Sequence, residues 1–305
     1  MGLRQLASER DILRPFGEPE VLLLYGLAAA KLKGFLEDRE VAARVWLRDK
    51  QLLKRGSFMP PLTAEELSKG VTEDLLALRA EEENLKVARE RLTPLQLKIW
   101  QYFLPRKLAD FFYATNRERP GRPIRRVFFD IDRAADMRHE TAREVAGLFV
   151  EAISGDDEID SFTVGEPLVA WTGSSFHVYL TLREEWPAAF YDEYFAYTEG
   201  KRGRFTSRWI EYVKSRAEAK ILGGHEKQPG VIVIDPSQTP SGKLARSPLG
   251  SLHMSDYQTV NGLSLPVKAE QLKERGLTDG LRAYTPQKLL EELDELATLL
   301  PQPQP

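Results

Sequence analysis

The chain has 305 residues, of which 42% are hydrophobic and 29% charged, a composition typical of a globular protein. It contains no cysteine, which excludes disulfides, thiolate-held iron–sulfur clusters and cysteine-based zinc sites. The formal net charge of −3 argues against a protein that coats nucleic acid through bulk positive charge. No apolar stretch is long enough to span a membrane, and residues 1–14 lack the apolar block of a secretory signal. We therefore expect a cytoplasmic protein with no membrane partner.

The first hundred residues are expected to form a helical module. Apolar residues at helical intervals and helix-start signals predict helices over residues 21–36, 41–53 and 72–91, and from Thr93-Pro94 onward. Thr63 with Glu66 has the pattern of a capping box, in which each residue's side chain accepts from the other's backbone N–H.

The pattern changes after a turn at Pro120-Gly121-Arg122-Pro123. Strands are predicted at 124–131, 168–171, 176–182 and 231–234, and helices at 138–153, 185–197 and 207–222. This mixture predicts an α+β protein with three parts: a helical N-terminal module at 1–105, a mixed domain at 106–285, and a C-terminal helix with a Pro/Gln tail at 286–305.

Two local basic clusters could contact nucleic acid in spite of the negative net charge. The first flanks residue 130 and comprises Arg117, Arg119, Arg122, Arg125, Arg126 and Arg133. The second lies within 201–220 and is equally consistent with a solvated helix face and with a template-binding surface.

Asp130 and Asp132 follow the apolar run Val127-Phe128-Phe129. Because side chains alternate along a strand, both carboxylates project from one face, about 7 Å apart. Such a pair can bind a hard divalent cation such as Mg²⁺ or Mn²⁺. The alternative is an ordinary acidic pair at the surface end of a strand.

Asp235 follows the β-branched apolar run 231–234. By itself, Asp235-Pro236 also suits a turn that ends a strand. Together with Asp130 and Asp132 it would supply the third carboxylate that two-metal phosphoryl transfer commonly uses.

Thr172-Gly173-Ser174-Ser175 is a loop of small residues that enters a strand containing His177. Small residues let backbone N–H groups approach phosphate oxygens, and hydroxyls add further donors. A single strand histidine is usually a core residue, but the loop directly before it favours phosphate contact. Further along the chain, Arg246 could bind phosphate with two parallel hydrogen bonds and His253 could donate a third; alone, that segment is an ordinary basic loop.

Along the chain come the Asp130/Asp132 pair, then the small-residue loop with His177, then Asp235, then the segment from Arg246 to His253. In this order the four elements resemble the archaeo-eukaryotic primase superfamily, over about residues 117–265. They are most similar to the catalytic small subunit of archaeal and eukaryotic DNA primases and to plasmid primase–polymerases. The resemblance implies a primase-polymerase catalytic core with an RRM-like sheet at 106–285. It also implies that Asp130, Asp132 and Asp235 hold two Mg²⁺ or Mn²⁺ ions. The implied contacts to nucleotide phosphates are Ser174, Ser175, His177, Arg246 and His253.

The activity implied by the resemblance is template-directed nucleotide addition that makes or extends primers in DNA replication or repair. The implied partners are a single-stranded DNA template, nucleoside triphosphates, and a primase large subunit or another replication protein. The family's usual Cys/His zinc knuckle cannot form without cysteine, so we expect a divergent member with no zinc or iron–sulfur cluster.

Three other interpretations stay open. A glycosyltransferase also uses D-x-D to hold Mn²⁺ and a nucleotide-sugar, but does not need Asp235. A β-type polymerase places its Gly-Ser element before the aspartates, whereas here the loop follows them. A non-catalytic nucleic-acid-binding subunit would keep the fold without turnover.

Overall fold

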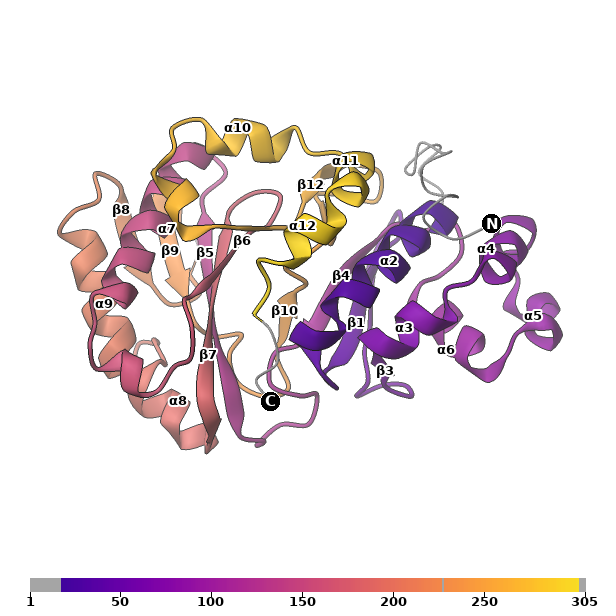
Figure 1. The fold of residues 1–305 in the computed structure, drawn as a ribbon, viewed down its shortest axis with the longest axis horizontal. Helices are drawn as coiled ribbons and strands as arrows, with labels where there is room; N and C mark the ends of the chain where they lie inside the picture. The colour runs from indigo at the N-terminus through magenta and orange to yellow at the C-terminus, as the bar shows by residue number, and fades with distance from the viewer. Residues whose placement is uncertain (1–17, 227, 302–305) are drawn as a thin grey trace. The chain divides into compact units, whose positions relative to one another are not determined.

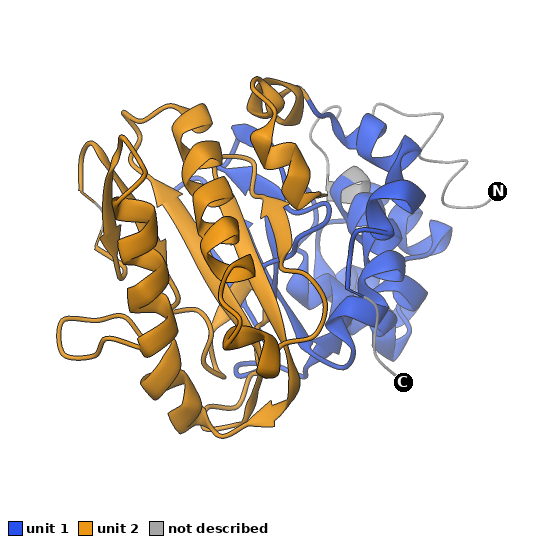
Figure 2. Ribbon diagram, turned by 60° about the vertical axis from the view of Figure 1, so that its left-hand side comes forward, with its two compact units in different colours: residues 1–113, 246–264, 284–305 blue, residues 114–245, 265–283 orange. Residues whose placement is uncertain are grey.

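The computed structural model describes residues 18–226 and 228–301 (Figure 1). The chain forms two compact units, shown in different colours in Figure 2. Unit 1 comprises residues 1–113, 246–264 and 284–305, and unit 2 comprises residues 114–245 and 265–283. The predictions for residues 1–14 and for the tail 302–305 lie outside the described residues. Within the described ranges, no helix is both long and apolar enough to cross a membrane.

Unit 1 combines helices with a small antiparallel sheet. Its helices are α2 (Glu18–Leu36), α3 (Ala64–Gly70), α4 (Glu73–Glu81), α5 (Leu85–Ala88), η1 (Arg89–Arg91), α6 (Pro94–Tyr102), α11 (Pro286–Glu291) and α12 (Leu293–Ala297). Its strands are β1 (Glu40–Trp46), β2 (Gln51–Lys54), β3 (Leu62–Thr63), β4 (Ala109–Ala114), β11 (Leu252–Met254) and β12 (Val260–Leu263). The order in the sheet is β10-β4-β1-β2, with β3 also paired to β1, and β10 (Leu244–Arg246) leads the chain back into this unit.

Local sequence signals fix two helix starts in unit 1. The Thr63 hydroxyl accepts from Glu66 N–H at 3.2 Å, and the Glu66 carboxylate accepts from Thr63 N–H at 3.0 Å, which confirms the predicted capping box. Thr93 and Gln96 form the same reciprocal pair at the start of α6, as the sequence predicts.

The prediction of a helix over 41–53 is wrong, because this segment forms β1, a turn and β2. β1 is paired on one side with β4 and on the other with β2 and β3, and most of its residues are buried. Pairing with these strands, which no local pattern contains, overrides the Ala- and Leu-rich composition that makes residues 41–53 look helical.

The predicted continuous helix at 72–91 is interrupted after Glu81. The Asn84 side chain accepts from Lys86 N–H at 3.0 Å and starts a separate short helix. This cap at Asn84 competes with continuation of the helix and explains the break.

Unit 2 is built on a six-stranded sheet in the order β13-β6-β7-β5-β9-β8. The strands are β5 (Ile124–Arg133), β6 (Leu168–Trp171), β7 (Phe176–Trp186), β8 (Lys220–Gly223), β9 (Val231–Asp235) and β13 (Leu265–Val267). The helices are α7 (His139–Ser154), η2 (Ile159–Ser161), α8 (Ala188–Tyr194), α9 (Arg204–Lys214), η3 (Ala269–Lys273) and α10 (Leu277–Arg282). The four strands predicted for this region are confirmed, and α7 lies within one residue of its predicted limits.

The predicted helix at 207–222 ends at Lys214, and residues 220–223 form β8 instead. β8 pairs in parallel with β9, so the backbone bonds of the sheet override the local helical composition. The limits of the two units differ from the predicted domain limits. Residues 246–264, which lie within the predicted domain 106–285, belong to unit 1.

The two faces of β5 have different surroundings. Phe129 packs against Phe149 of α7 and Trp209 of α9, with ring centroids 5.0 and 5.9 Å away. Figure 2 shows these helices across one face of the sheet. Phe128, on the opposite face, contacts the His177 and Tyr179 rings of β7 at 4.7 and 5.2 Å. Alternation therefore places Asp130 and Asp132 on the face turned away from α7 and α9.

Candidate functional site

Three polar side chains form a row across adjacent strands in the centre of the unit 2 sheet. Asp130 of β5 is the register partner of Asp235 on β9 and of His177 on β7. Directly opposed residues in antiparallel strands project from the same face, with Cβ atoms about 5 Å apart. The fold thus aligns residues separated by more than a hundred positions in the sequence, as the sequence analysis required for a shared site.

Asp132 shares this face because it is two residues beyond Asp130, and its register partner is Val233. Among the described residues, however, no three His, Asp or Glu side chains are already gathered around a common point that could hold a metal ion. The backbone places the three carboxylates on the same face of the sheet. To coordinate a common ion, their side chains would have to turn toward one another.

Asp235 is a buried carboxylate, 7% exposed, whose environment disfavours its negative charge. Burial raises the pKa of Asp235 above its ordinary value, and the charge of Asp130 raises it further. Hydrogen bonds from Ser237 N–H and Oγ–H, both 2.8 Å, and the nearby His225 act in the opposite direction. A divalent cation would relieve the repulsion between the two aspartates, so their chemistry fits a metal site.

The central strand β5 is held in register by two polar side chains, Thr239 beyond the end of β9 and Asn116 between β4 and β5. Thr239 Oγ1 accepts from Phe128 N–H at 2.9 Å and donates to Phe128 C=O at 3.0 Å. Asn116 donates to Arg126 C=O and Thr239 C=O, and its side-chain oxygen accepts from the N–H groups of Arg125 and Arg126. These bonds extend the β5–β9 pairing and thereby keep Asp130 opposite Asp235.

His177 is 6% exposed and lies between Asp130 and the β7 aromatic residues. Its Nε2 is 3.4 Å from Asp130 Oδ1, and its Nδ1 is 3.2 Å from the Tyr179 hydroxyl. The side chain is therefore next to the carboxylates, in a position consistent with the phosphate contact expected from the sequence.

The loop Thr172–Ser175 connects β6 to β7 through a tight turn. Gly173 has φ +92°, a conformation that favours glycine. Thr172 Oγ1 accepts from Ser175 N–H at 2.9 Å, and the Ser175 hydroxyl donates to Ile131 C=O. Ser175 is therefore a buried brace between the loop and β5, while Ser174 is partly exposed.

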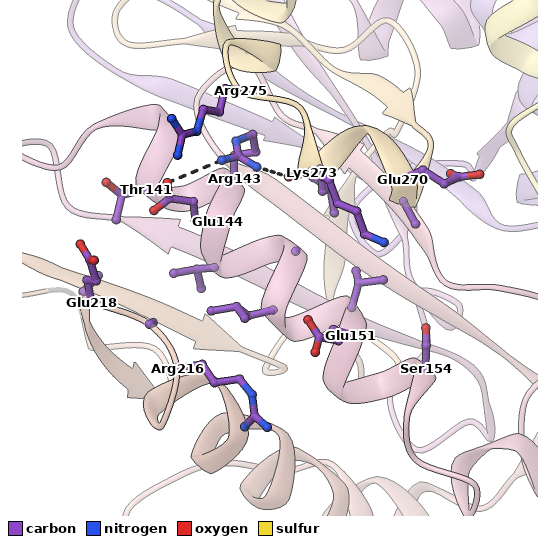
Figure 3. Close-up of a pocket in the computed structure, with 18 of the residues that line it drawn as sticks. Thr141, Arg143, Glu144, Glu151, Ser154, Arg216, Glu218, Glu270, Lys273 and Arg275 are labelled. Atoms are coloured by element: carbon purple, nitrogen blue, oxygen red, sulfur yellow. Dashed lines mark hydrogen bonds and ion pairs between the residues drawn. The ribbon is translucent and has the colours of Figure 1, made fainter.

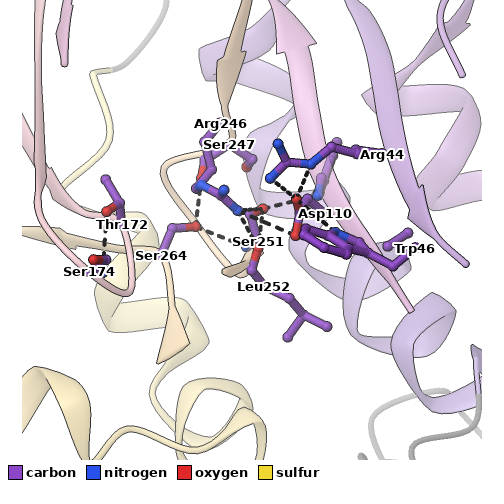
Figure 4. Close-up of polar contacts among 12 residues, drawn as sticks. Arg44, Trp46, Asp110, Thr172, Ser174, Arg246, Ser247, Ser251, Leu252 and Ser264 are labelled. Carbon is purple, nitrogen blue, oxygen red and sulfur yellow. Dashed lines mark hydrogen bonds and ion pairs between the residues drawn. The ribbon is translucent and has the colours of Figure 1, made fainter. Parts of the chain in front are cut away.

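Arg246 and His253 both belong to unit 1, and Figure 4 shows Arg246 beside Asp110 and Leu252. Arg246 is 7% exposed, donates to Leu252 C=O, and lies 3.7 Å from the carboxylate of the fully buried Asp110. Arg44 Nε donates to the same carboxylate at 2.6 Å. The Arg246 guanidinium thus has structural partners within its own unit. His253 lies on β11 opposite Gly262, next to a register irregularity.

Several residues near the predicted site were not assigned to it from the sequence. His225 and Tyr191 lie close enough to Asp235 for their charges to influence one another. Arg133 and His139 both contact the loop at Ser174. The position of Arg133 directly after Asp132 was a usable signal, whereas the approach of His139, His225 and Tyr191 depends on packing.

The second basic cluster is largely neutralised by nearby acidic side chains. Lys201 pairs with Asp192 at 2.7 Å, Arg208 with Asp156 at 2.5 Å, and Lys214 with Glu211 at 2.8 Å. Arg202 and Arg216 lie over the rings of Tyr197 and Tyr212. This arrangement favours the solvated helix face over a template-binding surface. In the first cluster, Arg126 is buried and Arg133 is bound to the loop, while Arg119 and Arg122 are exposed.

A groove of about 1200 Å³ runs along α7, between η3 and residues 216–219 (Figure 3). Its rim carries both signs of charge, including Glu151, Glu218, Arg216 and Lys273. None of the predicted site residues lines it.

Comparison with known proteins identifies the fold. The sequence matches no family profile and no curated protein. The structure is similar to that of the polymerase domain from Mycobacterium tuberculosis Ligase D in complex with DNA, with a TM-score of 0.55 and 16% sequence identity. The similarity covers 92% of each chain. At this level of identity the likeness establishes a common mixed α+β fold, which confirms the predicted fold class.

Proposed function

We propose, from the archaeo-eukaryotic primase fold that this chain shares with the Ligase D polymerase domain, that it is a metal-dependent nucleotidyltransferase. In this proposal the protein adds nucleotides to a primer on a single-stranded DNA template. The observation that carries it is the direct opposition of Asp130 and Asp235 on β5 and β9, with Asp132 on the same face. That the similar polymerase domain was solved with DNA supports a nucleic-acid substrate.

Asp130, Asp132 and Asp235 would hold two Mg²⁺ or Mn²⁺ ions. When bound, such ions activate the attacking 3′-hydroxyl and neutralise the charge of the leaving pyrophosphate. Most of the rate enhancement would come from orientation and charge complementarity, since phosphoryl transfer needs little covalent chemistry from the protein.

The neighbouring residues would bind and orient the nucleotide. His177, 3.4 Å from Asp130, is placed to donate to a phosphate bound near the carboxylates. The Ser174 hydroxyl and the backbone of the loop would add neutral donors beside it. Ser175 has a different role in this proposal, because its hydroxyl is bound to Ile131 C=O and stabilises the loop. Contacts from Arg246 and His253 to the triphosphate remain predictions from the resemblance.

The test is incorporation of labelled nucleotides on a primed single-stranded DNA template with Mg²⁺ or Mn²⁺. Asp130→Asn and Asp132→Asn should each lower the rate by about a hundredfold or more, the usual effect of removing an electrostatic contact to the transition state. Asp157→Asn changes an exposed aspartate of the same unit and serves as the matched control. Wild-type rates in a folded Asp130→Asn protein would refute the proposal.

The same preparation separates the competing interpretations. Transfer of sugar from a nucleotide-sugar donor without nucleotide incorporation would identify a glycosyltransferase. DNA binding by folded protein, with no incorporation under either ion, would identify a non-catalytic subunit.

A further inference from the structure

The carbonyl of Ser174, at the tip of the loop Thr172–Ser175, is held by two side chains from different elements. Arg133, at the end of β5, donates from Nε at 2.9 Å. His139, the first residue of α7, lies with Nδ1 also 2.9 Å away. The two side chains contact each other, with Arg133 Nη2 3.2 Å from His139 Nε2.

These distances define one consistent set of donors and acceptors. Arg133 can only donate, so His139 Nε2 must accept and Nδ1–H must donate to Ser174 C=O. The imidazole is therefore neutral when the three groups are joined. Further bonds from Arg133 Nη1 to Met137 C=O at 2.7 Å and Ala134 C=O at 3.3 Å fix the guanidinium itself.

The arrangement ties the loop to the strand that carries the aspartates. Arg133 is adjacent to Asp132 in the chain, so a movement of the loop relative to Asp132 would break the Arg133–Ser174 bond. The opposite side of the loop is fastened by the Ser175 hydroxyl to Ile131 C=O. His139 adds a second fixed point and packs edge-on against Trp171, with centroids 5.6 Å apart.

We propose that Arg133 and His139 are positioning residues, which hold the loop Thr172–Ser175 at a fixed place relative to Asp130 and Asp132 so that it can receive nucleotide phosphates. This inference rests on the proposed function, and it gives a structural role to two side chains outside the predicted site. A phosphate site and a metal site act together only when their spacing is correct, and a displacement of about 1 Å can cost about a hundredfold in rate.

Two substitutions of His139 distinguish the hydrogen bond from the packing. His139→Asn places an amide N–H near the position of Nδ1 and can still donate to Ser174 C=O. His139→Phe keeps the ring against Trp171 and removes both nitrogens. We expect His139→Phe to raise the KM for nucleoside triphosphate about tenfold, with a smaller change in kcat, whereas His139→Asn should restore most of the affinity.

Hydrogen–deuterium exchange of the loop tests the positioning without relying on activity. His139→Phe should speed exchange at residues 173–175 by about tenfold while α9 keeps wild-type protection, and His139→Asn should resemble the wild type. Arg133→Lys keeps the charge and loses the Nε donor, so it should also loosen the loop; it decides the matter should His139→Phe fail to fold.

The outcomes separate this proposal from the previous one. Unchanged loop exchange and unchanged KM in folded His139→Phe and Arg133→Lys proteins would overturn the positioning role. Absence of nucleotide incorporation by the wild-type protein would instead overturn the proposed function. Faster loop exchange in His139→Asn, with wild-type exchange in His139→Phe, would also count against positioning by the hydrogen bond, because it would assign the effect to the ring packing against Trp171.

Discussion

Asp130 and Asp235 lie directly opposite each other on antiparallel strands, although 104 other residues separate them in the sequence. Two like charges at this separation oppose one another, and Asp235 is also buried. The sheet therefore places a destabilising pair at its centre, and a bound cation would make that pair favourable.

Replacement of Asp235 by Asn should stabilise the protein when divalent ions are absent. The folded-state pKa of Asp235 is raised, so the charged form costs folding free energy as pH rises through that pKa. The advantage of Asp235→Asn should therefore be small near pH 4 and larger at pH 7. Urea unfolding in EDTA at both pH values measures it, and a variant less stable than wild type at pH 7 would contradict the expectation.

Divalent ions should stabilise the wild-type protein through the same pair. At an ion concentration one hundred times Kd, the free energy of unfolding should rise by about 2.7 kcal/mol. Asp130→Asn and Asp235→Asn should lose most of this gain, and Asp157→Asn should retain it. Thermal unfolding across a Mn²⁺ titration provides the measurement, and equal ion-dependent shifts in all four proteins would point to binding elsewhere.

Thr239 should be essential for the register of β5. Thr239→Val leaves the buried N–H and C=O of Phe128 without their hydroxyl partner and should cost about 1–3 kcal/mol. Thr239→Ser keeps the hydroxyl and should cost about 1 kcal/mol or less, the value of one methyl group. Urea unfolding compares the two variants, and a similar loss in both would indicate packing rather than hydrogen bonding.

Asp110 should be the principal stabilising charge of unit 1. It is fully buried and receives Arg44 Nε at 2.6 Å and Trp46 Nε1 at 3.2 Å. Asp110→Asn removes the charge that faces two guanidinium groups and should cost about 2 kcal/mol, below the range for fully buried pairs because Arg44 is one-third exposed. Circular dichroism during denaturation would detect it, and an unchanged midpoint would argue against the role.

His139 should make the loop sensitive to acid. Burial lowers its pKa, and the positive charges of Arg133 and Arg282 lower it further, against the opposing influence of the Ser174 carbonyl and Asp279. The neutral form is thus favoured on folding, so its stabilising contribution is present above the ordinary pKa of 6.5 and is lost as pH falls through the lowered value. NMR titration of the ring should give a pKa below 6.5, with faster loop exchange below it; a pKa above 6.5 would contradict the expected environment.

The sequence was most informative where a local interaction decides the structure. Thr63 with Glu66 and Thr93 with Gln96 contain their own capping partners, so both helix starts were predicted correctly. The alternation in β5 likewise predicted that Asp130 and Asp132 share a face. Residues 41–53 and 220–222 were wrongly predicted to be helical. Pairing with other strands decides their conformation, and no local sequence pattern shows that pairing.

The chemistry available to this protein can be read from its amino acids alone: three acidic residues, a small-residue loop before a histidine, and no thiol ligand. Which of these side chains meet depends on the three-dimensional fold. The register of β5 with β9 and β7 brings Asp130 to Asp235 and His177, and the packing of α7 brings His139 to Ser174. These contacts depend on strand pairing and helix packing between remote segments, and no short stretch of sequence contains the free energies of those interactions.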